Sequence, residues 1–414
     1  MKFKSILCLS LLLAMCLQLF ACGTQEPVTQ PTETQALSQS GTVNLMANVK
    51  PLAVQTQEAK PSYAVAAADF AVNFLQNAYA GENCILSPYS VYMALAMCAN
   101  GADAETLAQM QDALGMSAAE LNVYLYSLAQ NAGEELTNAN SVWFKQENGF
   151  APNSDFLQIN ADYYNADAFG ADFDDQTLAD INAWISENTN GQIEDALSQI
   201  DPLAKIYLIN ALFFDAQWRH AYDETMVREG VFHAQSGDQT VQMMHSEESR
   251  YLSDGNAVGF MKDYMGGQYS FVALMPDGDM ANYLAGLTGE NLLSTIENAT
   301  STTVFATMPK FELSCKMELK ETLSAMGMPL AFGDGADFSR MSNLELKIGQ
   351  VLHQTFIGVH ETGTQAGAST IVEMVTKGVA MKSETVVLDR PFVMAIFDNV
   401  NQCFLFLGVV EAVN

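Results

Sequence analysis

The stretch HETGTQAGAST, residues 360–370, is the part of the sequence from which the fold can be inferred. After Glu361 it carries no formal charge, and eight of its last nine residues are Gly, Ala, Ser or Thr. A loop usually includes charged residues and proline, whereas an ordinary strand carries bulky side chains. A run this small, which continues directly into IVEMVTKGVAMKSETVV, therefore needs a structural explanation.

Residues 364–374 fit a strand whose side chains alternate between two faces. The first face is uncharged and grows from small to large; it consists of Thr364, Ala366, Ala368, Thr370, Val372 and Met374. The second face carries the one charge of this run; it consists of Gln365, Gly367, Ser369, Ile371, Glu373 and Val375. Such a strand can bury one face and leave the other in water.

The small residues at the start of this strand let it enter between strands that are already packed. Burying Val372 and Met374 would then contribute about 1.5–3 kcal/mol each, and new ladder hydrogen bonds would add to that. The alternative is a permanently paired strand. Gly363 and Gly367 argue against that alternative, because glycine inside a strand weakens it.

Composition limits the classes of function. The chain has 414 residues, of which 49% are hydrophobic, so it can form one large domain or two ordinary ones. It has 18 basic and 48 acidic residues, which gives a net charge of −30. A chain this acidic repels phosphate backbones, so we expect no nucleic-acid partner.

The N-terminus has the features of an export signal. Lys2 and Lys4 precede an apolar run from Ile6 to Phe20, which is short for a membrane span. The run ends in LFAC, residues 19–22, which resembles the lipobox of bacterial lipoproteins although Phe20 is bulkier than usual. The resemblance implies cleavage before Cys22 and a lipid on its thiol. The alternatives are an ordinary secretory signal and an uncleaved anchor.

We therefore expect three regions: a lipoprotein signal peptide at 1–21, a flexible tether at 22–62 and a folded domain at 63–414. The tether is rich in Thr, Gln, Pro and Ser and has little periodicity. It would hold the domain outside the cytoplasm, anchored by lipid to the membrane or cell surface. The four cysteines beyond the signal lack metal-like spacing, so we predict buried free thiols at Cys84, Cys98, Cys315 and Cys403.

The domain is expected to be α+β, because helical patterns come early and strand patterns come late. Ser87 and Pro88 predict a helix start, and Asp103 and Gly115 predict the ends of a second helix. Residues 205–218 are apolar on both faces and predict a central, doubly buried strand with Asn210 in its middle. The segments RPFVMAIFD and QCFLFLGVV predict a hairpin.

The sequence lacks the common motifs for catalysis and cofactor binding. The sequence has no GxSxG, HExxH, GxxxxGK[ST] or GxGxxG, and none of its five histidines has ligand-like spacing. We therefore predict no catalytic residue, no metal and no cofactor, and we do not expect an enzyme.

The small run resembles the hinge of inhibitory serpins, the serine protease inhibitors. The family pattern is Glu, any residue, Gly, Thr, Glu and then small residues ending in Thr. Here it reads Glu361, Thr362, Gly363, Thr364, Gln365, Ala366, Gly367, Ala368, Ser369 and Thr370. Gln365 replaces the usual Glu on the solvent face. The resemblance implies a reactive-centre loop at about 361–386.

The resemblance covers the whole of 63–414. SPYSVYMALAMCANGA, NAWISENTNGQIEDAL, LINALFFDAQW, TMPKFEL and DRPFVMAIFD match family segments in order. It implies the serpin fold, in which helices pack around large mixed and antiparallel sheets with an exposed reactive-centre loop. It also implies a hydrogen-bonded cluster beneath the central sheet, the shutter, formed by Ser87, Ser90, Asn210 and His353. Trp218 matches the tryptophan of the breach, where the loop enters the sheet.

The resemblance implies a metastable, suicide-type inhibitor and a serine protease as partner. The protease would cut the loop and form an acyl-enzyme, and the freed hinge would insert into the central sheet. Sixteen residues past the hinge glutamate, the bond is Lys377–Gly378, which suits a trypsin-like enzyme. A cut after Met374 or Met381 would favour a chymotrypsin-, elastase- or subtilisin-like enzyme instead.

Two other functions stay open at this point. One is a non-inhibitory serpin-fold protein that serves as a binding or chaperone-like module; bulky, charged or proline residues in the hinge are typical of such members, and this hinge has none. The other is a surface enzyme or solute-binding lipoprotein, which no motif supports. We expect a monomer.

Overall fold

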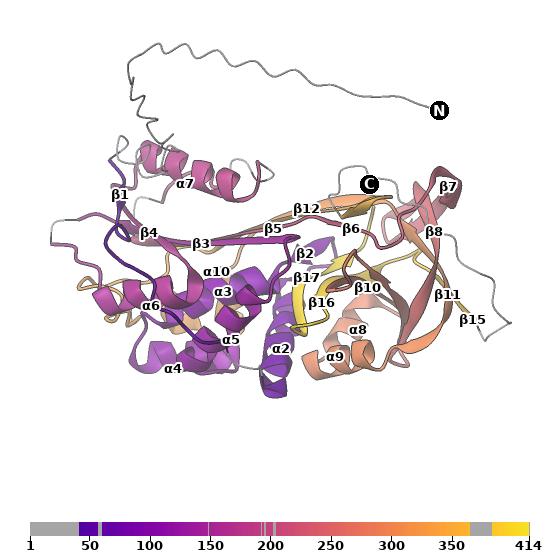
Figure 1. The fold of residues 1–414 in the computed structure, drawn as a ribbon, viewed down its shortest axis with the longest axis horizontal. Helices are drawn as coiled ribbons and strands as arrows, with labels where there is room; N and C mark the ends of the chain where they lie inside the picture. Colours follow the sequence, from indigo (N-terminus) through magenta and orange to yellow (C-terminus); the bar gives the residue numbers. More distant parts are fainter. Residues whose placement is uncertain are drawn as a thin grey trace, which may run out of the picture.

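The computed structural model describes residues 41–56, 60–147, 149–191, 193, 196–201, 204–364 and 383–413. Helices and three β-sheets alternate irregularly along the chain, which confirms the predicted α+β class. In Figure 1 most helices of the first half lie below the long strands β3 and β5, whereas α7 lies above them.

The described helices cover both faces of the sheets. They are α2 (Pro61–Ala78), α3 (Pro88–Ala99), α4 (Ala104–Leu114), α5 (Ala118–Gln130), α6 (Ser154–Tyr164), α7 (Asp175–Asn188), α8 (Met280–Gly286), α9 (Gly289–Glu297) and α10 (Lys320–Ala325), with 3-10 turns at Glu224–Met226 and Pro329–Phe332. The predicted helix boundaries are confirmed. Ser87 caps α3 with Pro88 in its first turn, Asp103 caps α4, and Gly115 ends α4 with a φ of 70°.

The largest sheet has nine strands. Its order is β15 (Ser383–Val387), β11 (Thr300–Pro309), β8 (Gly237–Ser253), β9 (Ala257–Asp263), β10 (Tyr269–Pro276), β16 (Phe392–Asp398), β17 (Cys403–Val410) and β2 (Cys84–Leu86), with β7 (Val227–Ala234) paired to β8. The antiparallel β16–β17 pair is the predicted hairpin.

Two four-stranded sheets lie where a single central sheet is expected. One has the order β1 (Val43–Asn44), β4 (Asp167–Ala171), β3 (Leu136–Lys145) and β5 (Ile206–Phe214). The other has the order β12 (Phe311–Glu318), β13 (Leu352–Val359), β14 (Gly363–Thr364) and β6 (Ala216–Gln217). Since β6 follows β5 directly, the two sheets are joined at one end only.

The long edge of β5 is therefore unpaired in the part of the chain that the structure describes. β5 pairs with β3 from Ile206 to Phe214, β13 pairs with β12, and no described ladder joins β5 to β13. The prediction that β5 is buried on both faces is wrong, because most of its residues between Leu208 and Phe213 are only half-buried. A strand whose outer edge has no neighbour leaves part of its side chains accessible.

The core continues on both sides of these sheets. Above β3 and β5, α7 closes a small core in which Trp143 of β3 lies near Phe169 and Ile181 (Figure 1). Below them, α3 and α5 belong to a large core shared with β16 and β17. Of the four predicted buried free thiols, all are free, and Cys84, Cys98 and Cys403 are buried; Cys315, on the outer strand β12, is half-exposed.

The end of the predicted tether lies on the domain, which corrects its boundary. Val43 pairs with Gly170 of β4, and the Leu45 amide donates to the Ala168 carbonyl at 2.8 Å. The Thr42 hydroxyl is buried and donates to Asp180 at 2.6 Å. The edge of β4 offers backbone partners to any extended segment, a contact that composition cannot reveal.

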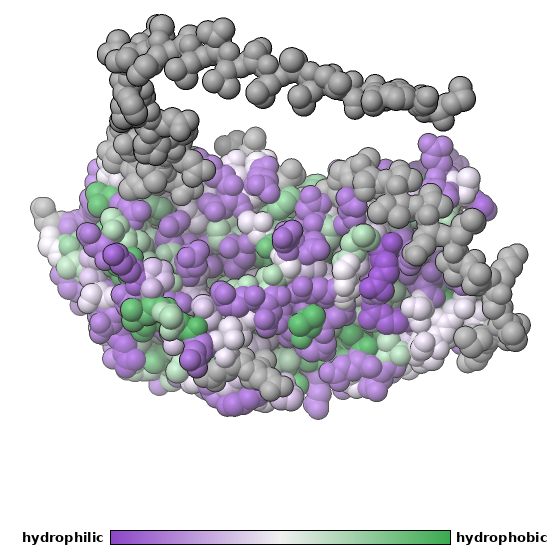
Figure 2. All heavy atoms as spheres, in the orientation of Figure 1, coloured by the Kyte–Doolittle hydropathy of each residue, from purple (hydrophilic) through white to green (hydrophobic). Residues whose placement is uncertain are grey.

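The surface agrees with the composition. On the face shown in Figure 2, hydrophilic residues predominate and apolar residues are scattered between them. The large acidic excess disfavours self-association through repulsion between copies. Within the described residues, no helix is long and apolar enough to cross a membrane.

Candidate functional site: the hinge and the strands around it

The first residues of the predicted hinge already form a strand. In β14, Gly363 lies opposite Gln217 of β6, and Thr364 lies opposite Ala216 and also Val359 of β13. A Cβ on Gly363 would come within 2.1 Å of the Ala216 carbonyl oxygen. Our interpretation of Gly363 as a sign against stable pairing is therefore wrong, because the missing side chain is what allows the two backbones to approach.

Thr364 shows which face of the hinge strand points into the core. Its side chain is buried, as the alternating pattern predicts for this residue, and its hydroxyl lies 2.6 Å from the Tyr264 hydroxyl. Tyr264 is stacked on Trp218, with ring centroids 4.3 Å apart. The strand face that begins at Thr364 therefore starts on the core side of the sheet.

Trp218 lies at the end where β6 meets the hinge, as the resemblance implied. Its indole Nε1–H donates to the His360 carbonyl at 2.8 Å, and its backbone amide donates to the Thr362 carbonyl at 2.9 Å. The amide of Tyr222 donates to the Glu361 carbonyl at 2.9 Å. Three donors from one short segment thus hold three consecutive carbonyls before β14.

The hinge glutamate is paired with Lys310, the residue between β11 and β12. Glu361 Oε2 lies 3.0 Å from Lys310 Nζ, and about a third of each side chain is exposed. Partial burial is the largest single effect and favours the neutral carboxyl, but the hydrogen bond and charge of Lys310, the Glu361 backbone amide and the charge of His360 together outweigh it and lower the pKa of Glu361. At neutral pH this exposed pair fixes orientation and adds little stability.

Three of the predicted shutter residues come together. The Ser87 amide donates to Nε2 of His353 at 3.0 Å, and the Ser87 hydroxyl donates to the Leu405 carbonyl at 2.8 Å. The Ser90 amide donates to Ser87 Oγ at 3.3 Å. Burial lowers the pKa of His353 to about 4, so its ring is neutral at pH 7, as an accepting Nε2 requires.

Asn210 is bonded elsewhere. Its Nδ2 donates to Asn138 Oδ1 at 2.5 Å and to Asn140 Oδ1 at 2.7 Å, both on β3. Asn140 in turn donates to the Tyr164 carbonyl at 3.0 Å. Asn210 does find distant partners, but these are not the Ser87–His353 group that the resemblance supplied. Asn210 on β5 and His353 on β13 therefore belong to separate networks on either side of the unpaired edge.

Several predicted site residues lie outside the described residues. They are Cys22, Gln365, Ala366, Gly367, Ala368, Ser369, Thr370, Lys377 and Gly378. Conversely, sequence reasoning missed Asn138, Asn140, Tyr222, Tyr264 and Lys262 as neighbours of the site. Only Lys262 gave a signal, since it is a single cation inside the apolar segment GFMKDY.

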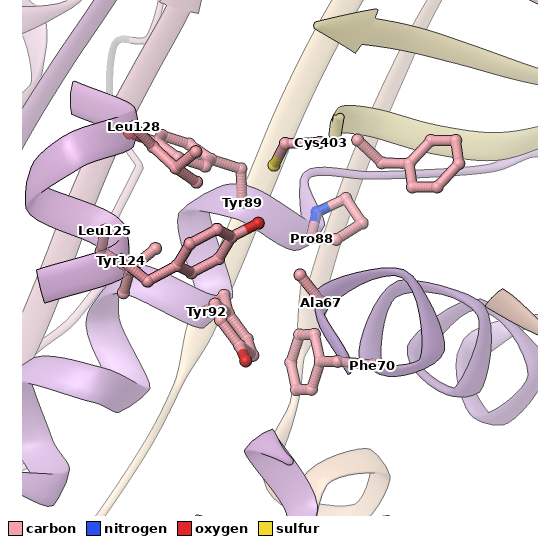
Figure 3. Close-up of a pocket in the computed structure, with 10 residues that line it drawn as sticks. Ala67, Phe70, Pro88, Tyr89, Tyr92, Tyr124, Leu125, Leu128 and Cys403 are labelled. Atoms are coloured by element: carbon pink, nitrogen blue, oxygen red, sulfur yellow. The ribbon is translucent and has the colours of Figure 1, made fainter. Parts of the chain in front are cut away.

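A small cavity lies beside α3, the helix that carries Ser87 at its start. This cavity, of about 10 Å³, lies between α2, α3, α5 and the start of β17 (Figure 3), and has space for about one water. The hydroxyl of Tyr124 faces it and has no hydrogen-bond partner among the described residues. Among all the residues that the structure describes, no cluster of three or more His, Cys, Asp or Glu is arranged to hold a metal ion.

Comparison with known proteins gives the family. A family model described as serpin, serine protease inhibitor, matches residues 65–413. The chain belongs to the serpin family, and its fold is the serpin fold. An uncharacterised serpin-like protein of Methanosarcina mazei is 31% identical over 80% of this chain and 81% of its own. The leukocyte elastase inhibitor of Bos taurus is 30% identical over 79% and 92%.

Solved structures agree and add the conformational state. Tengpin, a thermophilic serpin, is 43% identical, and its native state covers 90% of this chain and 100% of its own with a TM-score of 0.85. Its latent state covers 87% and 100% with a TM-score of 0.77. The present structure is thus more similar to the native form, in agreement with the unpaired edge of β5. Family members are mostly protease inhibitors rather than enzymes.

Proposed function

We propose that this protein is a suicide-type inhibitor of serine proteases. The observation that carries the proposal is the edge of β5 that is unpaired among the described residues, together with β14, which already pairs with β13 and with β6, the short strand that follows β5. A strand that continues from Thr364 would meet backbone donors and acceptors on each side. The small uncharged face that follows Thr364 in the sequence suits such an insertion.

The chemistry belongs to the protease, and the inhibitor supplies a substrate and a moving strand. The serine oxygen of the protease attacks the carbonyl carbon of Lys377, the Lys377–Gly378 bond breaks, and the new amine of Gly378 takes up a proton. An ester now links Lys377 to the enzyme. The freed hinge inserts between β5 and β13 and carries the ester with it before water can hydrolyse it.

The residue at the cut sets the choice of protease. A lysine favours an enzyme with an acidic specificity pocket, so we propose a trypsin-like target and assign the bond to Lys377–Gly378. A cut after Met374 or Met381 would mean a chymotrypsin-, elastase- or subtilisin-like target. The relative named leukocyte elastase inhibitor makes elastase a useful second probe.

The experiment uses residues 23–414 mixed with trypsin, followed by denaturing electrophoresis and mass spectrometry. We expect an SDS-stable adduct together with a released peptide that begins at Gly378. Parallel reactions with elastase and subtilisin show whether another enzyme is the target. Cleavage without an adduct by all three would support the alternative of a non-inhibitory binding or chaperone-like protein.

We also propose a lipid anchor at Cys22, which places the inhibitor outside the cytoplasm on a membrane or cell surface. The support is the LFAC sequence after a short apolar run. The full chain should partition with membranes and carry the mass of a lipid on its first mature residue. The Cys22→Ser variant should be found in the soluble fraction; membrane association of that variant would contradict the proposal.

A further inference from the structure

Lys262 is an unusual residue for its position. It lies in β9 with 2% of its surface exposed, among the apolar residues of the core. Its ammonium group donates to Glu248 Oε1 at 2.8 Å and to the His220 carbonyl at 3.0 Å. The Glu248 side chain is itself only 10% exposed. This is a buried ion pair next to the hinge.

Two aromatic rings complete the surroundings of Lys262. Its Nζ lies 4.4 Å from the centroid of the Tyr222 ring and 5.5 Å from that of the Trp218 ring. Both distances fall within the range of cation–π attraction. One ammonium group therefore contacts Trp218, His220 and Tyr222, which are three alternate residues of the same short segment.

The backbone of the same segment, residues 218–222, is hydrogen-bonded to the hinge. The amides of Trp218 and Tyr222 donate to the carbonyls of Thr362 and Glu361. Lys262 is thus connected to the hinge backbone through one intermediate residue in each case. It does not contact the hinge itself.

The Lys262–Glu248 pair is not explained by a gain in the stability of the fold. Burying an ion pair costs desolvation, and well-packed apolar residues of similar volume are often as stabilising or more so. What an ion pair adds is a defined geometry, because the ammonium group can contact the carboxylate, the carbonyl and the two ring faces at once in only one arrangement of these groups. We propose that Lys262, paired with Glu248, is a positioning residue that holds segment 218–222 so that β14 stays seated between β6 and β13.

This inference rests on the proposed inhibitory function and assigns a role within it. When β14 is paired with β6 and β13, the register of the inserting strand is already set, so pairing can extend from Thr364 onward once the loop is cut. When β14 is not held in place, these first pairs must form before insertion can proceed. Insertion then starts later, more acyl-enzyme is hydrolysed, and more inhibitor is consumed for each protease molecule trapped.

The test compares Lys262→Met with Lys262→Arg, which keeps a cation for Glu248 and the two rings. Lys347→Met serves as the matched control, because it breaks the exposed pair with Asp334. The double variant Lys262→Met/Glu248→Gln removes both charges, so it remains informative if the single variant fails to fold. Each is titrated against trypsin, or against whichever enzyme the wild type traps, to obtain the stoichiometry of inhibition and the rate of loop cleavage.

For Lys262→Met and the double variant, we expect the stoichiometry of inhibition to rise, because the ratio of hydrolysis to insertion, which is the stoichiometry minus one, should rise about fivefold. That change corresponds to about 1 kcal/mol in the competition between the two steps. The rate of loop cleavage should not change, because the proposed role of Lys262 concerns insertion, which follows the cut. Lys262→Arg and Lys347→Met should behave like the wild type. An unchanged stoichiometry in the folded double variant, or no rescue by arginine, would overturn the assignment.

A second measurement separates this inference from the proposed function. Hydrogen exchange of the amides in peptide 218–222 reports on the positioning without any protease. We expect faster exchange in Lys262→Met than in the wild type and in Lys347→Met. If the wild type traps no protease, the inhibitory function fails, and equal exchange rates would then refute the positioning role on their own.

Discussion

At the scale of single residues, His353 links the helix α3 to the strand β13. Its neutral ring accepts a hydrogen bond from the Ser87 amide, which has no intrahelical partner because it lies at the start of α3. The ring also lies edge-on to Phe74, with centroids 5.9 Å apart. A proton on Nε2 would remove this acceptor and place a charge in the core.

The depressed pKa of His353 predicts a loss of stability in acid. Its pKa is about 4 in the folded protein against 6.5 for the ordinary side chain, so its contribution is fully present above pH 6.5 and is lost as the pH falls towards 4. Between pH 7 and 4.5 the free energy of unfolding should fall by about 2–3 kcal/mol more in the wild type than in His353→Gln. Urea unfolding at both pH values measures this. Equal losses would show that His353 is not the group responsible.

Tyr124 gives a prediction of opposite sign. Its buried hydroxyl has no partner among the described residues, whereas the Tyr92 hydroxyl, beside the same cavity, donates to the Leu114 carbonyl. Tyr124→Phe should leave the free energy of unfolding unchanged or raise it by about 1 kcal/mol, and Tyr92→Phe should lower it by a similar amount. Urea denaturation of both variants tests the contrast. A clear loss in Tyr124→Phe would mean that a bound water satisfies the hydroxyl.

Residues differ in how far the sequence alone predicts their role. Ser87 and Gly115 were predicted correctly as helix boundaries because capping depends on a few neighbours in the chain. The partners of Asn210 were not, because Asn138 and Asn140 become its neighbours only when β3 pairs with β5. The motif of the family placed Asn210 near the centre of the sheet but could not supply its contacts.

At the scale of elements, the short strand β14 is the feature that the pattern analysis described least well. The sequence predicts a strand that is not permanently paired, and Gly363 and Gly367 are the residues that argue for this. In the structure Gly363 pairs with β6, and Thr364 pairs with both β6 and β13. Sequence periodicity states which face of a strand is apolar but says nothing about which of its residues are already paired.

The seating of β14 predicts that Gly363→Ala weakens inhibition. The added methyl group would lie 2.1 Å from the Ala216 carbonyl oxygen, so β14 and β6 must separate. We expect the stoichiometry of inhibition to rise, while the loop is cut as fast as in the wild type. Gly349→Ala is the control, because its methyl group would meet Ala204 at an ordinary 3.6 Å. Wild-type stoichiometry in Gly363→Ala would show that β14 need not be seated.

Two other elements departed from expectation for related reasons. β5 reads as doubly buried because its sequence is apolar on both faces, yet its open edge leaves part of it accessible. Such a composition suits a strand that lies at the edge of its sheet before insertion and in the centre of the sheet after it. The segment 41–56 reads as a tether because it lacks periodicity, yet the edge of β4 gives its backbone a partner. Edges of sheets thus account for both differences.

At the scale of the whole molecule, β5 and most of β13 each have one edge without a partner strand among the described residues, which predicts that cutting the loop stabilises the protein. Insertion would add two ladders of hydrogen bonds and bury an apolar face, with about 1.5–3 kcal/mol from each large side chain. Protein nicked by trypsin without being trapped should therefore unfold at a higher urea concentration than intact protein. Both forms can be compared on one urea-gradient gel. An equal or lower midpoint would contradict insertion.

The place where the N-terminal segment joins the body has a further consequence. Across the ladders, Val43 lies opposite Gly170, Gly170 opposite Phe144, and Phe144 opposite Ile206, which is the end of β5 farthest from the hinge. In Figure 1, β1 and β15 accordingly lie at opposite ends of the long axis. If the chain is lipid-anchored, as we propose, β15, which follows the reactive-centre loop in the sequence, lies at the end of the domain opposite to the anchored segment. Insertion along β5 towards Ile206 would then carry a trapped protease towards the membrane.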